Sequence, residues 1–104
     1  METLFFHGKT TDGKRFTIAG KPNANGFTVA ASLCSKNDLF VKKIGRAKAA
    51  GRLESNLKHV EMVVDTTDHG TTAFINKMKE FNLVKSRDFQ LVFNLNPNNT
   101  NFTL

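Results

Sequence analysis

The first third of the chain alternates strand-like runs with turn residues, and this pattern restricts the fold more than any other feature of the sequence. The strand-like runs occupy residues 3–11, 15–21 and 27–34. Asp12-Gly13 separates the first two runs, and Asp-Gly in that position is a strong hairpin signal. Asn and Gly in the segment 22–26 accept positive φ angles and supply the second turn. The sequence therefore predicts a three-stranded antiparallel meander.

A helix and a fourth strand are predicted to follow the meander. Ser35 and Asp38 have the spacing of a capping box at a helix start. A carboxylate near that end also suits the helix dipole. The run 56–65 then predicts a strand, because every second residue from Val60 to Val64 is apolar and lies on one face.

The last part of the chain predicts one more helix and one more strand. Apolar residues recur at helical spacing over 71–82. Over 87–95, Phe and Leu alternate with other residues, which predicts a closing strand. The expected fold is α+β in the order βββαβαβ, with its two helices packed on one face of an antiparallel sheet.

Size and composition fit one small domain. The chain has 104 residues, of which 39% are hydrophobic and ten are Phe. A core of useful size is possible at this length. We expect one domain over residues 1–95 and a flexible Asn-rich tail over 96–104.

The sequence also indicates the compartment. A single Cys cannot form an internal disulfide and suits a reducing environment. No apolar run reaches the roughly 20 residues of a membrane span, and the N-terminus lacks the pattern of a signal peptide. We expect a cytoplasmic protein with no membrane partner.

Positive charge is concentrated in one half of the chain. Residues 1–60 contain eleven Lys and Arg against four Asp and Glu, a net charge of +7, whereas 61–104 have a net charge of −1. A basic region of this kind predicts a polyanionic partner or an acidic protein. The alternative is that the charge serves solubility alone.

The predicted first helix contains six of these cations and two glycines. With Ile44 at the centre of its buried face, the helix places Phe40, Ala47 and Gly51 toward the core. Lys42 and Arg46 then lie on the opposite face, beside Ala49.

This composition is unfavourable for a helix. Lys42 and Arg46 are like charges at i,i+4, which costs about 0.2–0.5 kcal/mol, and Gly45 costs about 1 kcal/mol relative to Ala. We interpret Gly45 as a low point where a negatively charged partner approaches the helix. Two structural alternatives are that the glycines permit close packing on a strand and that Gly45 divides the helix in two.

The predicted binding residues are the cations of this helix and of the first hairpin. Nucleic acid, whether DNA or RNA, would be bound mostly through phosphates and with little sequence preference. An acidic host protein is the alternative partner. The residues are Lys42, Lys43, Arg46, Arg52, Lys36, Lys48, Lys14 and Arg15.

The residues that could carry catalysis or bind a metal are scattered along the sequence. His7, His59 and His69 are far apart in sequence and show no metal-site spacing. Cys34 has no nearby His in the sequence and is expected to be a small buried residue. The segment 68–72 is interpreted as a turn and helix cap. We therefore predict a protein that is not an enzyme and that uses no cofactor or metal.

The run 32–52, SLCSKNDLFVKKIGRAKAAGR, resembles a pattern of small uncharacterised proteins encoded by bacteriophages and prophages. That pattern has Cys-Ser, a spaced Asp and Phe, Lys-Lys-x-Gly-Arg and a second Gly-Arg. The matching residues are Cys34, Ser35, Asp38, Phe40, Lys42, Lys43, Gly45, Arg46, Gly51 and Arg52. The resemblance covers about a fifth of the chain. It implies a phage accessory protein in the bacterial cytoplasm that binds nucleic acid or, alternatively, inhibits a host protein.

Overall fold

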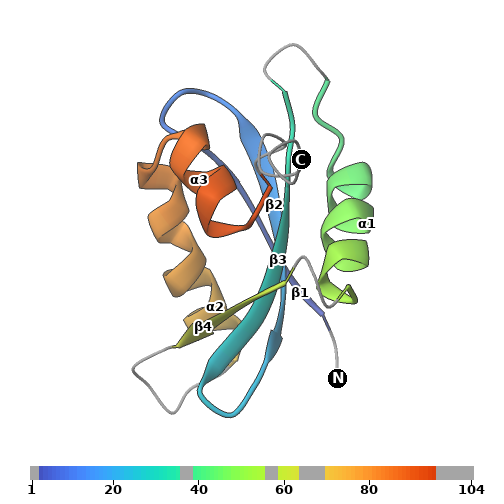
Figure 1. Ribbon diagram of the computed structural model, residues 1–104, viewed down its shortest axis with the longest axis vertical. Helices are drawn as coiled ribbons and strands as arrows, with labels where there is room; N and C mark the ends of the chain where they lie inside the picture. Colours follow the sequence, from blue (N-terminus) through green and yellow to red (C-terminus); the bar gives the residue numbers. More distant parts are fainter. Residues whose placement is uncertain (1–2, 36–38, 56–58, 64–69, 96–104) are drawn as a thin grey trace, which may run out of the picture.

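An antiparallel sheet forms the centre of the α+β fold in the computed structural model, which describes residues 3–35, 39–55, 59–63 and 70–95 (Figure 1). Its four described strands are neighbours in chain order. They are β1 (Leu4–Lys9), β2 (Arg15–Pro22), β3 (Gly26–Leu33) and β4 (Val60–Val63). The predicted meander is confirmed, since β1 pairs with β2 and β2 pairs with β3.

The helices lie on both faces of this sheet, so the expectation of helices on one face is wrong. Helix α1 (Lys42–Leu53) packs on β2 and β3 from one side. Helix α2 (Thr71–Met78), the 3-10 helix η1 (Lys79–Leu83) and helix α3 (Ser86–Val92) cover the other side (Figure 1). The described part of the chain is therefore a three-layer arrangement with the sheet in the middle.

Residue size decides which helices cover which face. One face of β2 and β3 carries Phe16, Ile18, Phe27 and Val29, and all four side chains are fully buried. They pack with the apolar residues of α2, η1 and α3 in the main core. The core residues of those helices are Ala73, Phe74, Met78, Phe81, Phe89 and Phe93.

The opposite face of the same strands is lined by small side chains. Thr17 and Ala19 on β2 and Ala30 and Ser32 on β3 are all buried. Together with Ala49 and Leu53 of α1, the two alanines form a second, smaller apolar cluster. Small residues bring a helix backbone close to a sheet, so this face determines how α1 docks.

The predicted closing strand over 87–95 is wrong, because residues 86–92 form helix α3. Phe89 and Phe93 are four residues apart, so they share a helix face and are both fully buried in the main core. Asp12, from the first hairpin turn, accepts hydrogen bonds from the Ser86 backbone N–H, at 2.7 Å, and from its hydroxyl. This cap from a distant turn fixes the start of the helix.

Other sequence predictions differ in their boundaries or fall outside the described residues. Helix α1 begins at Lys42, and the proposed capping residue Asp38 lies outside the described part. Strand β4 covers the middle of the predicted run 56–65, and residues 56–58 and 64–65 of that run lie outside the described part. The tail 96–104 also lies outside the described residues.

Candidate nucleic-acid interface

Helix α1 is rotated relative to the sequence prediction. Its buried residues are Gly45, Ala49 and Leu53, whereas Ile44 is 53% exposed. Gly51, expected in the core, is exposed as well. The small side chains on this face of the sheet bring the helix backbone close to it, and little space remains between the two. The helix therefore buries its own small residues and turns the larger Ile44 outward.

Gly45 marks the closest approach of α1 to the sheet. A Cβ atom added there would clash with the side chain of Thr17 on β2. The Gly45 carbonyl accepts a hydrogen bond of 3.1 Å from the Ser32 hydroxyl on β3. Gly45 is therefore a packing glycine facing the sheet, as one of the structural alternatives held, and the interpretation of Gly45 as a low point facing a partner is wrong.

This docking brings five residues from four parts of the chain to one place, here called the cationic cluster: His7 of β1, Arg15 of β2, Phe40 before α1, and Lys42 and Arg46 of α1. The Arg15 guanidinium carbon lies 4.8 Å from the centre of the Phe40 ring, in a cation–π contact. The rings of Phe40 and His7 meet edge to face, with centres 6.0 Å apart. Phe40 also lies beside Gly45, so its ring joins α1 to the hairpin.

The pKa of His7 responds to all three cations of the cluster. Its Nδ1 is 2.8 Å from the Thr17 hydroxyl. Partial burial lowers the pKa of His7, and the positive charges of Lys42, Arg46 and Arg15 lower it further. Three cations close enough to disfavour a fourth positive charge form a region of positive potential.

Among the described residues, no carboxylate forms an ion pair with a cation of this region. The ion pairs found there join Lys21 to Glu54, at 2.7 Å, and Lys77 to Glu80, at 3.3 Å. Neither pair involves a cation of the cluster. Among the residues that the structure describes, the three cations of the cluster therefore have no carboxylate partner.

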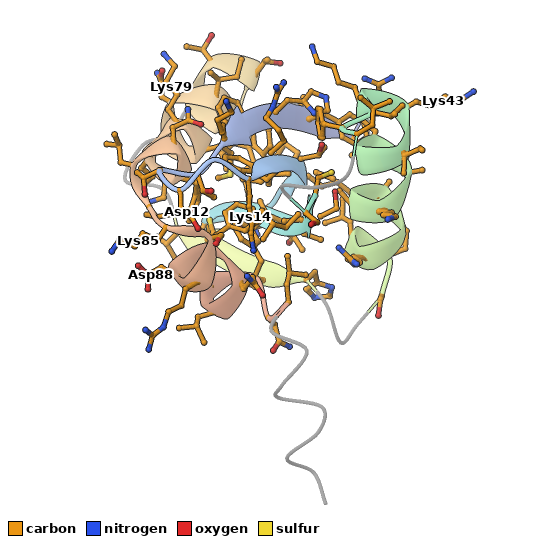
Figure 2. All side chains as sticks on the ribbon, turned by 90° about the horizontal axis from the view of Figure 1, so that it is seen from above. Asp12, Lys14, Lys43, Lys79, Lys85 and Asp88 are labelled. Carbon is orange, nitrogen blue, oxygen red and sulfur yellow. The ribbon has the colours of Figure 1, made fainter. Side chains whose placement is uncertain are left out.

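Two predicted binding residues of α1 are not among the cations that act on His7. Lys43 and Lys48 are exposed, and the Lys43 side chain extends from α1 away from the sheet (Figure 2). Lys36 lies outside the described residues.

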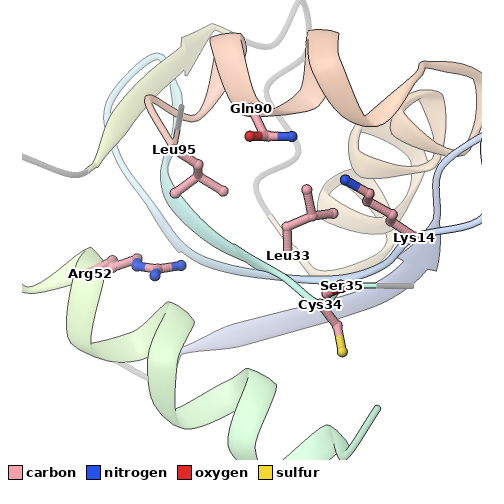
Figure 3. A pocket seen from close by; sticks show the side chains of 7 residues that line it. All are labelled: Lys14, Leu33, Cys34, Ser35, Arg52, Gln90 and Leu95. Carbon is pink, nitrogen blue, oxygen red and sulfur yellow. The ribbon is translucent and has the colours of Figure 1, made fainter. Parts of the chain in front are cut away.

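Two further predicted residues line a second cavity, near the end of β3. Lys14 and Arg52 line this cavity of about 220 Å³ together with Gln90 of α3 (Figure 3). Arg52 has a structural role there. Its Nη1 donates a 2.8 Å hydrogen bond to the Ala31 carbonyl. Because β4 pairs with β3 only as far as Val29, that carbonyl lies on an open sheet edge.

His7 and Phe40 were not predicted as site residues. The sequence presents His7 only as a possible metal ligand, and the helical periodicity predicts Phe40 in the core. Phe40 is instead partly exposed and belongs to neither buried core cluster. Both residues acquire their role from contacts between distant segments, so no local spacing identifies them.

Within the described residues, no group of three or more His, Cys, Asp or Glu side chains is arranged to hold a metal ion. None of the described helices is long and apolar enough to cross a membrane. No family model, curated protein or solved structure matches this chain.

Proposed function

We propose that this protein binds nucleic acid, largely without sequence preference, through the phosphates that meet the cationic cluster. The observation that carries the proposal is the grouping of Arg15, Lys42 and Arg46 around the contacting rings of Phe40 and His7, without carboxylate partners among the described residues. Arginine forks and lysine ammonium groups are the side chains that bind phosphate oxygens most often.

The surroundings of the cations favour nucleic acid over an acidic protein. Phe40 and His7 add two partly exposed rings within the same cluster. Rings beside cations suit the alternation of bases and phosphates in a strand. An accessory role in a bacteriophage, acting in the bacterial cytoplasm, is the setting that the sequence resemblance implies.

Charge reversal tests the proposal. The Lys42→Glu, Arg46→Glu variant is compared with wild type for binding to labelled single-stranded and double-stranded oligonucleotides by fluorescence anisotropy. The Lys79→Glu, Lys85→Glu variant is a matched control, because it changes the net charge equally at exposed positions beyond the other face of the sheet (Figure 2).

We expect the α1 variant to lose at least tenfold in affinity and the control to lose less than threefold, with both folded by circular dichroism. Equal losses would mean that net charge, and not the cluster, determines binding. If wild type binds no oligonucleotide but captures an acidic protein, the protein-partner alternative replaces this proposal.

A further inference from the structure

A pocket with both polar and apolar lining residues adjoins the cationic cluster, and the two share Phe40. Its volume is about 250 Å³, which is slightly below the roughly 300–1,000 Å³ of sites for drug-sized ligands. A pocket of this size suits one ring system. Its lining comprises Ser32, Leu33, Cys34, Ser35, Leu39, Phe40, Val41, Ile44, Gly45 and Lys48.

The apolar side chains of this pocket are unusually exposed. Leu39 is 88% exposed and Ile44 is 53% exposed. Neither side chain belongs to a core cluster. Exposed apolar side chains that gather around one concave surface indicate a binding site more than scattered ones do.

Phe40 connects the pocket to the cluster. It lines the pocket and also contacts Arg15 and His7 of the cluster. Lys42 follows directly after Val41, another lining residue. A ligand with an anionic group on the cluster and a flat apolar group in the pocket would use both surfaces at once.

We propose that this pocket receives an unpaired base of a single-stranded nucleic acid whose adjacent phosphate lies on Arg15, Lys42 and Arg46. This inference rests on the proposed function and specifies its ligand. An aromatic wall beside phosphate-binding cations is the arrangement by which proteins bind single strands. A duplex keeps its bases stacked inside, so a base would reach the pocket only after it is unpaired and unstacked, which is unfavourable.

The test compares two single strands with the same number of phosphates, a 12-residue thymidine strand and a 12-residue abasic strand. Fluorescence anisotropy measures both affinities for wild type, for Leu39→Ser and for Leu83→Ser. Leu39 and Leu83 are similarly exposed, at 88% and 79%, but Leu83 lies on η1 and not in the pocket. Neither substitution removes a buried side chain, so both variants should fold.

We expect wild type to bind the thymidine strand about tenfold more tightly than the abasic strand, in line with the stacking of one base. Leu39→Ser should reduce that ratio at least threefold, while Leu83→Ser leaves it unchanged. If both strands bind wild type equally well, the pocket receives no base and this inference fails while the proposed function stands. If neither strand binds at low salt, this inference fails, and the proposed function fails with it when the double-stranded oligonucleotide is not bound either.

Discussion

The backbone of Gly45 lies against the side chain of Thr17 so closely that a single methyl group at position 45 would clash with it. Thr17 is in turn within hydrogen-bond distance of His7. This line of contacts, from α1 through β2 to β1, sets the separation between the cations of the helix and those of the hairpin. The cationic cluster therefore depends on a residue that carries no charge.

Replacement of Gly45 by Ala should destabilise the fold by up to about 2 kcal/mol. Overpacking of a tight contact costs roughly 1–3 kcal/mol, and the better helix propensity of Ala recovers about 1 kcal/mol of it. Gly51→Ala is the matched control, since an added Cβ there meets no atom within 4 Å. It should stabilise by about 0.5–1 kcal/mol. Urea unfolding of the two variants measures both effects, and equal effects would contradict the docking of α1 described here.

The pKa of His7 should lie below its usual value of 6.5, because of burial and the three neighbouring positive charges. The neutral form is then favoured in the folded state. The stability that this shift provides is present above pH 6.5 and is lost as the pH falls from there through the folded-state pKa. An NMR titration of the His7 ring measures the value directly.

Lys42→Gln should raise the pKa of His7, since it removes one of those charges, whereas the distant Lys79→Gln should not. An unchanged His7 pKa in Lys42→Gln would place Lys42 away from the cluster.

Stability should also depend on Asp12 at acid pH. Hydrogen bonds from Ser86 and Thr10 hold the pKa of the Asp12 carboxyl well below its usual 3.8. A lowered carboxyl pKa adds stability that is present above the unfolded-state value and is lost as the pH falls through the folded-state value. Wild type should therefore lose stability more steeply below about pH 4 than Asp12→Asn, in thermal unfolding followed from pH 7 to pH 2. Parallel curves for the two proteins would show that Asp12 does not hold α3 in this way.

Arg52→Gln should affect stability more than binding. It removes the hydrogen bond from a partly buried guanidinium to the Ala31 carbonyl, which should cost about 1–2 kcal/mol. Affinity for nucleic acid should change less than threefold, because Arg52 lies outside the cationic cluster. A large loss of affinity with unchanged stability would contradict this and would show that Arg52 binds nucleic acid, as the sequence predicted.

Local signals in the sequence are sufficient to predict the meander of β1, β2 and β3 but not the helix α3. The Asp12-Gly13 turn and the alternation in β3 depend on neighbouring residues, so they can be interpreted without tertiary structure. Phe89 and Phe93 are compatible with both a strand and a helix, because a spacing of four fits either period. Contacts with the core and the cap from Asp12 decide for the helix, and neither is visible in the local pattern.

The sequence predicts which cations belong to the site but not how helix α1 is oriented on the sheet. The sequence identified Arg15, Lys42 and Arg46 as candidates, and the structure brings these three together. It could not show that the sheet face beneath α1 is lined by Thr17 and small residues, so hydrophobicity wrongly placed Ile44 inward. That rotation of the helix decides which of its cations face the hairpin.

The salt dependence of oligonucleotide binding tests the central claim most directly. Affinity for a labelled 12-residue single strand is measured by anisotropy from low to physiological salt, for wild type and for Lys42→Ala, Arg46→Ala. Three phosphate contacts predict a slope of about −2 in a plot of log K against log salt concentration for wild type, and a clearly smaller slope for the variant. No binding at low salt, or the same slope for both proteins, would contradict a phosphate-binding role for the cationic cluster.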